Sequence, residues 1–263
     1  MDVQDLVRSH YGAGDLAGHI LAALAEAGVD TDQLGPQDLF AVDQLHAGGP
    51  DASRHVLDRM QVGPGVRLLD VGCGIGGTSR MAAMTGAEVT GVDLSPVFVE
   101  TATTLTERVG LAERARFLVT AGEAMPLEDE SFDAAVMVHV GMNVPEKTQV
   151  FRDVRRVLKP GGIFAVYDQV RTGAGDLPYP LPWAQDERSS FVESASAYRE
   201  HLDEAGFTAV DVEDRTSAGA VPPPPGPVTN QVVFGDAFVE RIGNNVAATK
   251  AGLLGAVLVL ARA

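Results

Sequence analysis

The chain has 263 residues, 45% of them hydrophobic, and its 36 acidic against 20 basic residues give a formal net charge of −16. This composition is typical of a globular protein with a sizeable core, and the excess of acid argues against nucleic acid or an anionic membrane surface as a partner. The single cysteine, Cys73, excludes an internal disulfide and a cysteine-based zinc site, as in proteins of the reducing cytosol.

The first residues lack the basic and apolar regions of a signal peptide, and no run of about 18 apolar residues follows. We therefore expect a cytoplasmic protein, a monomer or homodimer, that acts on a small molecule and holds no metal. Residues 1–50 show two helical patterns and a loop, which predict an N-terminal helical cap or lid. Tyr11, between the two helices, is a candidate pocket residue, with core packing as the alternative.

The loop before residue 50 carries Gln44 and His46 ahead of two adjacent glycines, where the backbone can pass close to a ligand. Gln44 is a candidate cofactor contact and His46 a candidate base, with a structural turn as the alternative for both. A helix over residues 51–60 is expected next, with Asp51 as its N-cap.

An apolar run over residues 66–71 breaks into glycines at 72, 74, 76 and 77, followed by a helix-compatible segment. This pattern predicts a buried strand, a tight loop and a helix. Gly72, Gly74 and Gly77 satisfy G-x-G-x-x-G, and an acid, Asp93, follows about 20 residues later, as in nucleotide-binding folds.

Asp70 stands at the end of that strand, directly before the glycines. A dinucleotide would place its pyrophosphate against this loop, where a carboxylate repels it. A cationic ligand such as S-adenosylmethionine would instead be attracted, with Asp93 accepting hydrogen bonds from both ribose hydroxyls. A turn or cap residue is the alternative for Asp70. Leu94, next to Asp93, is a further candidate cofactor contact.

Residues 88–93 and 116–120 are predicted as the second and third strands, and Ser95 should cap the helix between them. The loop after the third strand offers Glu123 and Ala124 as candidate contacts to an adenine ring, with an ordinary turn as the alternative.

A fourth strand over residues 132–139 ends at His139, and ligands of open α/β sheets bind beyond such carboxyl ends. His139 is therefore a candidate contact to cofactor or substrate and a candidate general base, with a structural histidine as the alternative. Asn143, one helical turn further on, caps the segment or lines the same pocket.

A helix over residues 147–158 should be stopped by the Pro-Gly-Gly that follows, and a fifth strand should cover residues 163–168. A loop rich in proline then offers Tyr179 and Trp183 as walls of a substrate pocket, with a rigid surface connector as the alternative. The remaining patterns predict helices over 196–206 and 228–251 and strands over 208–212 and 255–261.

Strands that alternate with helices predict an α/β, Rossmann-like, doubly wound and mostly parallel sheet. We expect this domain to cover residues 51–263, with residues 171–200 and 215–250 as insertions that shape the substrate pocket.

Four motifs in this order resemble class I S-adenosylmethionine-dependent methyltransferases (type 11-like); they lie at residues 68–77, 92–95, 131–133 and 156–162. The resemblance implies a seven-stranded sheet whose last strand is antiparallel, and a cofactor held by Asp70, Gly72, Gly74 and Asp93. Segments 43–49, 139–144 and 179–184 are similar to a small-molecule branch related to sarcosine and dimethylglycine methyltransferases. By analogy they bring His46, His139 and Trp183 to one pocket.

The chemistry implied is an in-line displacement in which an N, O or C atom of a metabolite attacks the sulfonium methyl, so positioning supplies most of the acceleration. A base, His139 or His46, is needed only where the acceptor holds its proton tightly. Two alternatives remain open: a nicotinamide-dependent oxidoreductase, and an S-adenosylmethionine-binding protein without catalytic activity.

Overall fold

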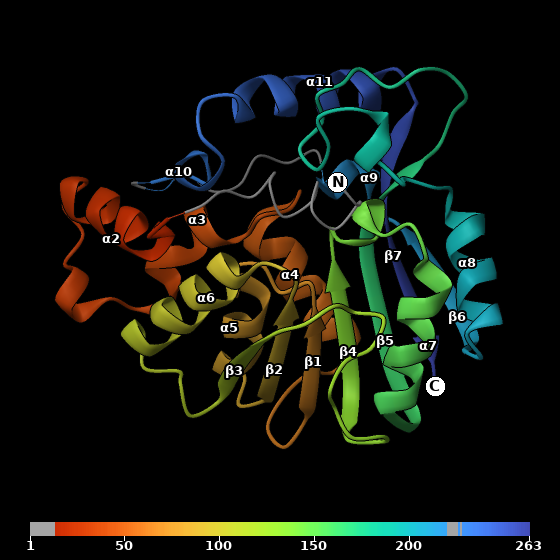
Figure 1. Ribbon diagram of the computed structural model, residues 1–263, viewed down its shortest axis with the longest axis horizontal. Helices are drawn as coiled ribbons and strands as arrows, with labels where there is room; N and C mark the ends of the chain where they lie inside the picture. The colour runs from red at the N-terminus through yellow and green to blue at the C-terminus, as the bar shows by residue number, and fades with distance from the viewer. Residues whose placement is uncertain (1–13, 220–225, 227) are drawn as a thin grey trace.

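The computed structural model describes residues 14–219, 226 and 228–263, so Tyr11 and the first predicted helix lie outside the described residues. Seven strands form one sheet in the order β3-β2-β1-β4-β5-β7-β6, with helices packed around it (Figure 1). β7 pairs antiparallel with both of its neighbours, β5 and β6, and the other pairs are parallel. The expected doubly wound sheet with an antiparallel last strand is confirmed.

The strands are β1 (Arg67–Val71), β2 (Glu88–Asp93), β3 (Ala115–Val119), β4 (Phe132–Val138), β5 (Leu158–Arg171), β6 (Thr208–Asp214) and β7 (Leu254–Arg262). The α-helices of the described residues are α2 (Leu16–Glu26), α3 (Phe40–Asp43), α4 (Gly49–Arg59), α5 (Gly77–Met84), α6 (Pro96–Arg108), α7 (Lys147–Val157), α8 (Ala195–Glu204), α9 (Thr216–Gly219), α10 (Gln231–Phe234) and α11 (Phe238–Lys250). Short 3-10 turns lie at η1 (Thr31–Gln33), η2 (Pro36–Leu39), η3 (Gly141–Asn143) and η4 (Glu187–Ser189).

Strand β1 shows why the sheet is covered on both faces. Successive side chains of a strand point to opposite faces, and Leu68 and Leu69 are both fully buried. Leu68 belongs to the apolar cluster that includes residues of α4 and α5, whereas Leu69 belongs to the cluster that includes residues of α7 and α8. Each such leucine contributes about 1.5–3 kcal/mol through burial, so the continuous apolar run stabilises both layers.

Three predicted elements differ from the structure. Helix α4 begins at Gly49, after Gly48 in the left-handed conformation, so Asp51 lies in the first turn and is not the N-cap. The predicted helix over 228–251 is broken into α10 and α11 at Gly235, whose φ of 73° a helix cannot continue. Strand β5 starts at Leu158, directly after α7, and Leu158 pairs with Phe132 of β4. The Pro-Gly-Gly that was expected to stop the helix therefore lies inside this strand.

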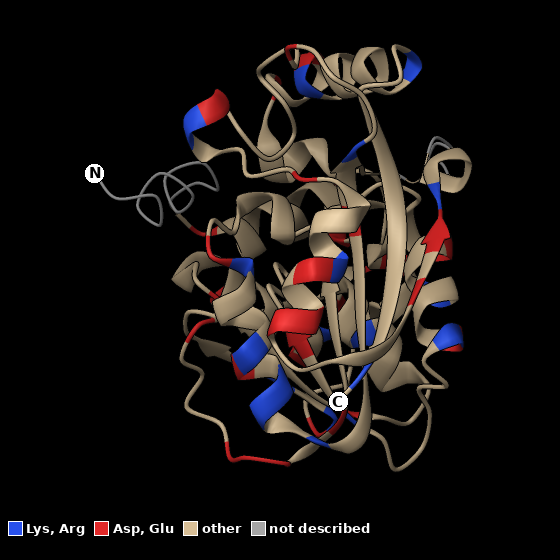
Figure 2. Ribbon diagram, turned by 90° about the vertical axis from the view of Figure 1, so that its right-hand side faces the viewer, with Lys and Arg blue, Asp and Glu red and all other residues tan. Residues whose placement is uncertain are grey.

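The carboxyl ends of the parallel strands meet at one edge of the sheet, which α11 covers at the top of Figure 1. In Figure 2, ribbon segments with basic residues lie among segments with acidic ones. No helix of the described residues is both long and apolar enough to span a bilayer.

Candidate active site

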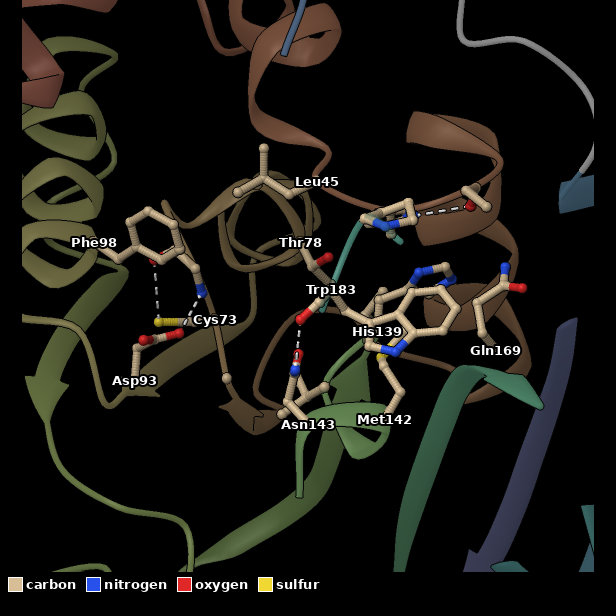
Figure 3. A pocket seen from close by; sticks show the side chains of 18 of the residues that line it. Leu45, Cys73, Thr78, Asp93, Phe98, His139, Met142, Asn143, Gln169 and Trp183 are labelled. Carbon is tan, nitrogen blue, oxygen red and sulfur yellow. Dashed lines mark hydrogen bonds between the residues drawn. The ribbon is translucent and has the colours of Figure 1, made fainter. Parts of the chain in front are cut away.

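A cavity of about 640 Å³ lies at this carboxyl edge, within the range of small-molecule sites. Loops after β1, β2, β3 and β4 line it, together with the segment before α4 and the helices α10 and α11. Figure 3 shows Cys73, Asp93 and Phe98 on one side and His139, Gln169 and Trp183 on the other. We call these sides the glycine-loop end and the tryptophan end.

The glycine-loop end is held together by Asp93, the last residue of β2. The main-chain N–H of Gly74 donates to Oδ2 of Asp93 at 2.9 Å, and that of Ser95 donates to Oδ1 at 2.9 Å. Gly72 and Gly74 have φ values of 72° and 54°, which only glycine adopts without strain. A Cβ on Gly72 would also lie 2.3 Å from a methyl group of Val140. The loop therefore requires these two glycines.

The third glycine of the motif, Gly77, serves packing. A Cβ there would lie 2.3 Å from the main-chain oxygen of Asp43, so the segment before α4 covers the N-terminus of α5. That N-terminus is where a Rossmann fold receives a pyrophosphate. The geometry therefore disfavours a dinucleotide at this loop.

A buried ion pair that our sequence analysis missed fixes the covering segment. Arg80 of α5 and Asp43 are both buried, and the Arg80 guanidinium donates to Oδ2 of Asp43 at 2.8 Å and to the Ile75 carbonyl at 2.7 Å. Asp43 also lines the cavity. No local sequence signal pairs these two residues, because 37 positions separate them.

Asp70 lies at the end of β1 with 2% of its surface exposed, and it lines the cavity. Ser79 Oγ donates to its Oδ2 at 2.6 Å. Burial, with a smaller contribution from the nearby Asp93, raises the pKa of Asp70 to about 6 against the opposing effect of the hydrogen bond from Ser79. A cationic ligand would stabilise the charged form of Asp70.

Both candidate histidines lie on the cavity wall, with their ring centroids 5.8 Å apart. Both ring nitrogens of His46 are in hydrogen bonds: Nδ1 with the Ala47 carbonyl, and Nε2 with the side chains of Ser53 and Gln44. His139 has a φ of 54°, and its buried Nε2 has no hydrogen-bond partner among the described residues. Burial lowers the pKa of His46 to about 4 and that of His139 well below its usual range, so both rings are neutral.

Four of the other predicted residues line the cavity: Leu94, Glu123, Asn143 and Trp183. Three are not among its lining residues: Gln44, Ala124 and Tyr179. The Gln44 amide is used inside the protein, donating to Asp43 and accepting from Ser53. Ala124 is exposed, and Tyr179 packs against the apolar cluster around Leu181.

Asn143 and Trp183 also have structural roles at the tryptophan end. Asn143 Nδ2 donates to the Trp183 carbonyl at 2.8 Å, and Trp183 Nε1 donates to Ser190 Oγ at 2.9 Å. These bonds anchor the proline-rich loop over the cavity, so that loop is a wall of the cavity.

Sequence analysis also missed Gln169 in β5 and Asn245 in α11, two lining residues whose buried amide oxygens have no hydrogen-bond partner among the described residues. Gln169 follows Asp168 on a strand and carries no local signal. Asn245 could have been found, because it stands beside Val246 and three residues after Ile242 on one helical face. The part of the chain that the structure describes holds no metal-binding cluster of His, Cys, Asp or Glu.

Part of the chain is similar in sequence to known methyltransferases. The family model described as a methyltransferase domain matches residues 69–166, which run from β1 into β5. A sterol 24-C-methyltransferase from Gibberella zeae is 40% identical over 114 residues, which are 43% of this chain and 30% of that protein. The matched region thus spans about a third of the length of the curated relatives. The expected resemblance to class I methyltransferases is confirmed over these residues.

Solved structures with low sequence identity share the fold. A phosphoethanolamine N-methyltransferase from Haemonchus contortus matches with a TM-score of 0.74 and 19% identity, covering 100% of this chain and 60% of that one. A geranyl diphosphate methyltransferase, solved with its substrate and sinefungin, has a TM-score of 0.68 and 21% identity, with 99% of each chain covered.

Proposed function

We propose that this chain is a methyltransferase that binds S-adenosylmethionine and transfers its methyl group to a small molecule. The observation that carries the proposal is a pair of carboxylates, the buried Asp70 and the half-buried Asp93, which lie at the ends of the adjacent strands β1 and β2 on one cavity. No lysine or arginine is among the lining residues that the structure describes. Such a wall favours a cationic ligand with ribose hydroxyls over a pyrophosphate.

The residues at the glycine-loop end fit this cofactor. Asp93 would accept hydrogen bonds from the ribose hydroxyls, Gly72 and Gly74 leave room for close approach, and Asp70 would face the positive charge. Leu94 and Glu123 line the same end and would contact the adenosine. Bound S-adenosylmethionine would supply a methyl group on a sulfonium: a nucleophile bonds to this methyl in line as its C–S bond breaks, and S-adenosylhomocysteine leaves as the neutral thioether.

The protein's part in such a displacement is positioning. Trp183 and the residues of α11 would hold the acceptor across the cavity from the glycine loop. His139, with Nε2 unpaired among the described residues, is placed to accept a hydrogen bond from the acceptor, and burial, which lowers its pKa, makes it a weak base there. His46 keeps both ring nitrogens in internal hydrogen bonds, so we assign it to positioning the loop before α4.

We also propose that residues 1–50 form a cap on a domain of residues 51–263, with pocket-shaping insertions at 171–200 and 215–250. This division is supported because the cap and both insertions contribute to the cavity wall. The cap provides Asp43 and His46, the first insertion provides Trp183, and the second provides residues of α10 and α11.

Calorimetric titration tests the cofactor. We expect S-adenosylmethionine and S-adenosylhomocysteine to bind with micromolar dissociation constants, and NAD and NADP to give no heat at millimolar concentration, because their pyrophosphate finds no cation on the described cavity wall. Binding of NAD with no binding of either sulfur ligand would overturn the proposal in favour of an oxidoreductase. Methyl transfer to an acceptor, measured with labelled cofactor, separates an enzyme from a protein that only binds.

A change of pH provides a second test. Burial raises the pKa of Asp70 to about 6, so this carboxyl group is ionised at neutral pH and protonated below its pKa. We expect S-adenosylmethionine to bind about tenfold more weakly at pH 5 than at pH 7, since only the ionised form attracts the cation. Asp70→Asn should bind weakly at both pH values and lose this dependence. A wild-type affinity that does not change with pH would contradict the assigned contact.

The same titration with S-adenosylhomocysteine identifies the cationic partner. That ligand keeps the ammonium group and lacks the sulfonium. An equal loss for both ligands would place Asp70 against the ammonium, and a loss for S-adenosylmethionine alone would place it against the sulfonium.

A further inference from the structure

One face of α11 is apolar and turned to the cavity. Phe238, Val239, Ile242 and Val246 follow one another at helical spacing, and all four line the cavity. Val239 is 64% exposed, Ile242 41% and Val246 44%. An apolar surface gathered inside a cavity marks a place where an apolar ligand is covered.

The tryptophan end also holds polar atoms without partners. Gln169 Oε1, Asn245 Oδ1 and His139 Nε2 are buried and have no hydrogen-bond partner among the described residues. Leaving such an atom unpaired costs about 1–3 kcal/mol, so each is a place for a ligand group or a water. All three groups are neutral, since two are amides and the third is an uncharged imidazole.

Charges are distributed unevenly along the cavity. Its four carboxylates come from the segment before α4, from the ends of β1 and β2 and from the loop after β3: Asp43, Asp70, Asp93 and Glu123. None comes from β4, β5 or α11, and the lining within the described ranges contains no lysine or arginine. A phosphate at the tryptophan end would have no cation to pair with, and an ammonium would have no carboxylate, so either would lose hydration without compensation.

We infer that the tryptophan end binds an uncharged, largely apolar alcohol, with its hydrocarbon part against α11 and Trp183 and its hydroxyl donating a hydrogen bond to Oε1 of Gln169. A hydroxyl can donate to this oxygen, which has no hydrogen-bond partner among the described residues, and it needs no counter-charge. This inference rests on the proposed function, because it treats the other end of the cavity as the cofactor site. It also separates this protein from the solved relative that takes geranyl diphosphate.

The test compares three ligands that share one hydrocarbon chain: geraniol, geranyl diphosphate and geranylamine. Each is titrated calorimetrically into protein saturated with S-adenosylhomocysteine. We expect geraniol to bind at least about tenfold more tightly than either charged ligand, since the charged groups stay unpaired. A charged ligand that binds as tightly as geraniol would overturn the inference. So would the absence of binding by both geraniol and its longer homologue farnesol.

Two variants locate the binding. Val239→Lys places a cation on the apolar face of α11. We expect this variant to bind geraniol more weakly and geranyl diphosphate more tightly than the wild type, so that the order of the two affinities is reversed. Val119→Lys is the matched control, because Val119 is 50% exposed on β3 and does not line the cavity. Equal effects of the two lysines would contradict the placement on α11.

Gln169→Met removes the amide at nearly constant volume. We expect this variant to bind geraniol roughly three- to tenfold more weakly, because a neutral hydrogen bond is lost. Its affinity for the deoxy hydrocarbon 2,6-dimethylocta-2,6-diene should not change. An equal loss for both ligands would contradict the hydroxyl contact.

Binding of S-adenosylhomocysteine is measured on every variant and shows that it is folded. If that ligand fails to bind the wild-type protein, the proposed function fails. If it binds and the order of the acceptor probes is wrong, only this inference fails.

Discussion

Replacement of Asp93 by alanine is expected to weaken the binding of S-adenosylmethionine by about two orders of magnitude. The ribose hydroxyls would lose a charged acceptor, and a hydrogen bond to a charged group contributes about 1.5–3 kcal/mol. Gly74 and Ser95 would at the same time lose the carboxylate that accepts their main-chain N–H groups. The dissociation constant from calorimetry is the measurement.

Glu88→Ala is the matched control for Asp93→Ala. Glu88 is the first residue of β2, at the opposite end of the strand from Asp93, and it is exposed. We expect this change to leave the dissociation constant unaltered. An Asp93→Ala variant that still binds within about threefold of the wild type would show that Asp93 does not hold the cofactor.

Replacement of Arg80 by leucine is expected to lower the free energy of unfolding by about 3–5 kcal/mol, the usual cost of removing one partner from a buried ion pair. Asp43 would remain buried without its cation. Because Asp43 covers the N-terminus of α5 and lines the cavity, we also expect weaker binding of the cofactor. Urea unfolding followed by circular dichroism measures the change in stability.

Two further variants isolate the cause. The double variant Arg80→Leu/Asp43→Asn removes the charge left behind and should be more stable than Arg80→Leu alone. Arg54→Leu removes an exposed arginine paired with Asp51 and should cost less than about 1 kcal/mol. If the double variant is no more stable than Arg80→Leu, the loss comes from packing and not from the unpaired carboxylate.

Much of the sheet and one end of the cavity could be predicted because their signals are local. The apolar run of β1 and its glycines occupy consecutive positions, and Ser95 caps α6 as expected by accepting from Phe98 N–H. Asp70 and Asp93 could be placed together because parallel strands align their carboxyl ends. Leu94 followed from its position next to Asp93, and Glu123 from the loop after the third strand.

The direction of a side chain in a loop was harder to predict. Gln44 and His46 are two positions apart, yet Gln44 is used inside the protein and His46 lies on the cavity wall. Tyr179 and Trp183 belong to one loop, and only Trp183 lines the cavity. A loop has no repeat that fixes which side chains point inward, so its neighbours in space decide.

The amino-acid sequence by itself determined the order of the strands along the chain, the glycine loop and the two carboxylates beside it, because each depends on residues close together in the chain. Only the tertiary structure decided which residues form the other end of the cavity. Gln169, Asn245, the apolar face of α11 and the Asp43–Arg80 pair come from distant segments. Their contacts arise when packing of the core brings those segments together, and no local pattern records which segments will meet.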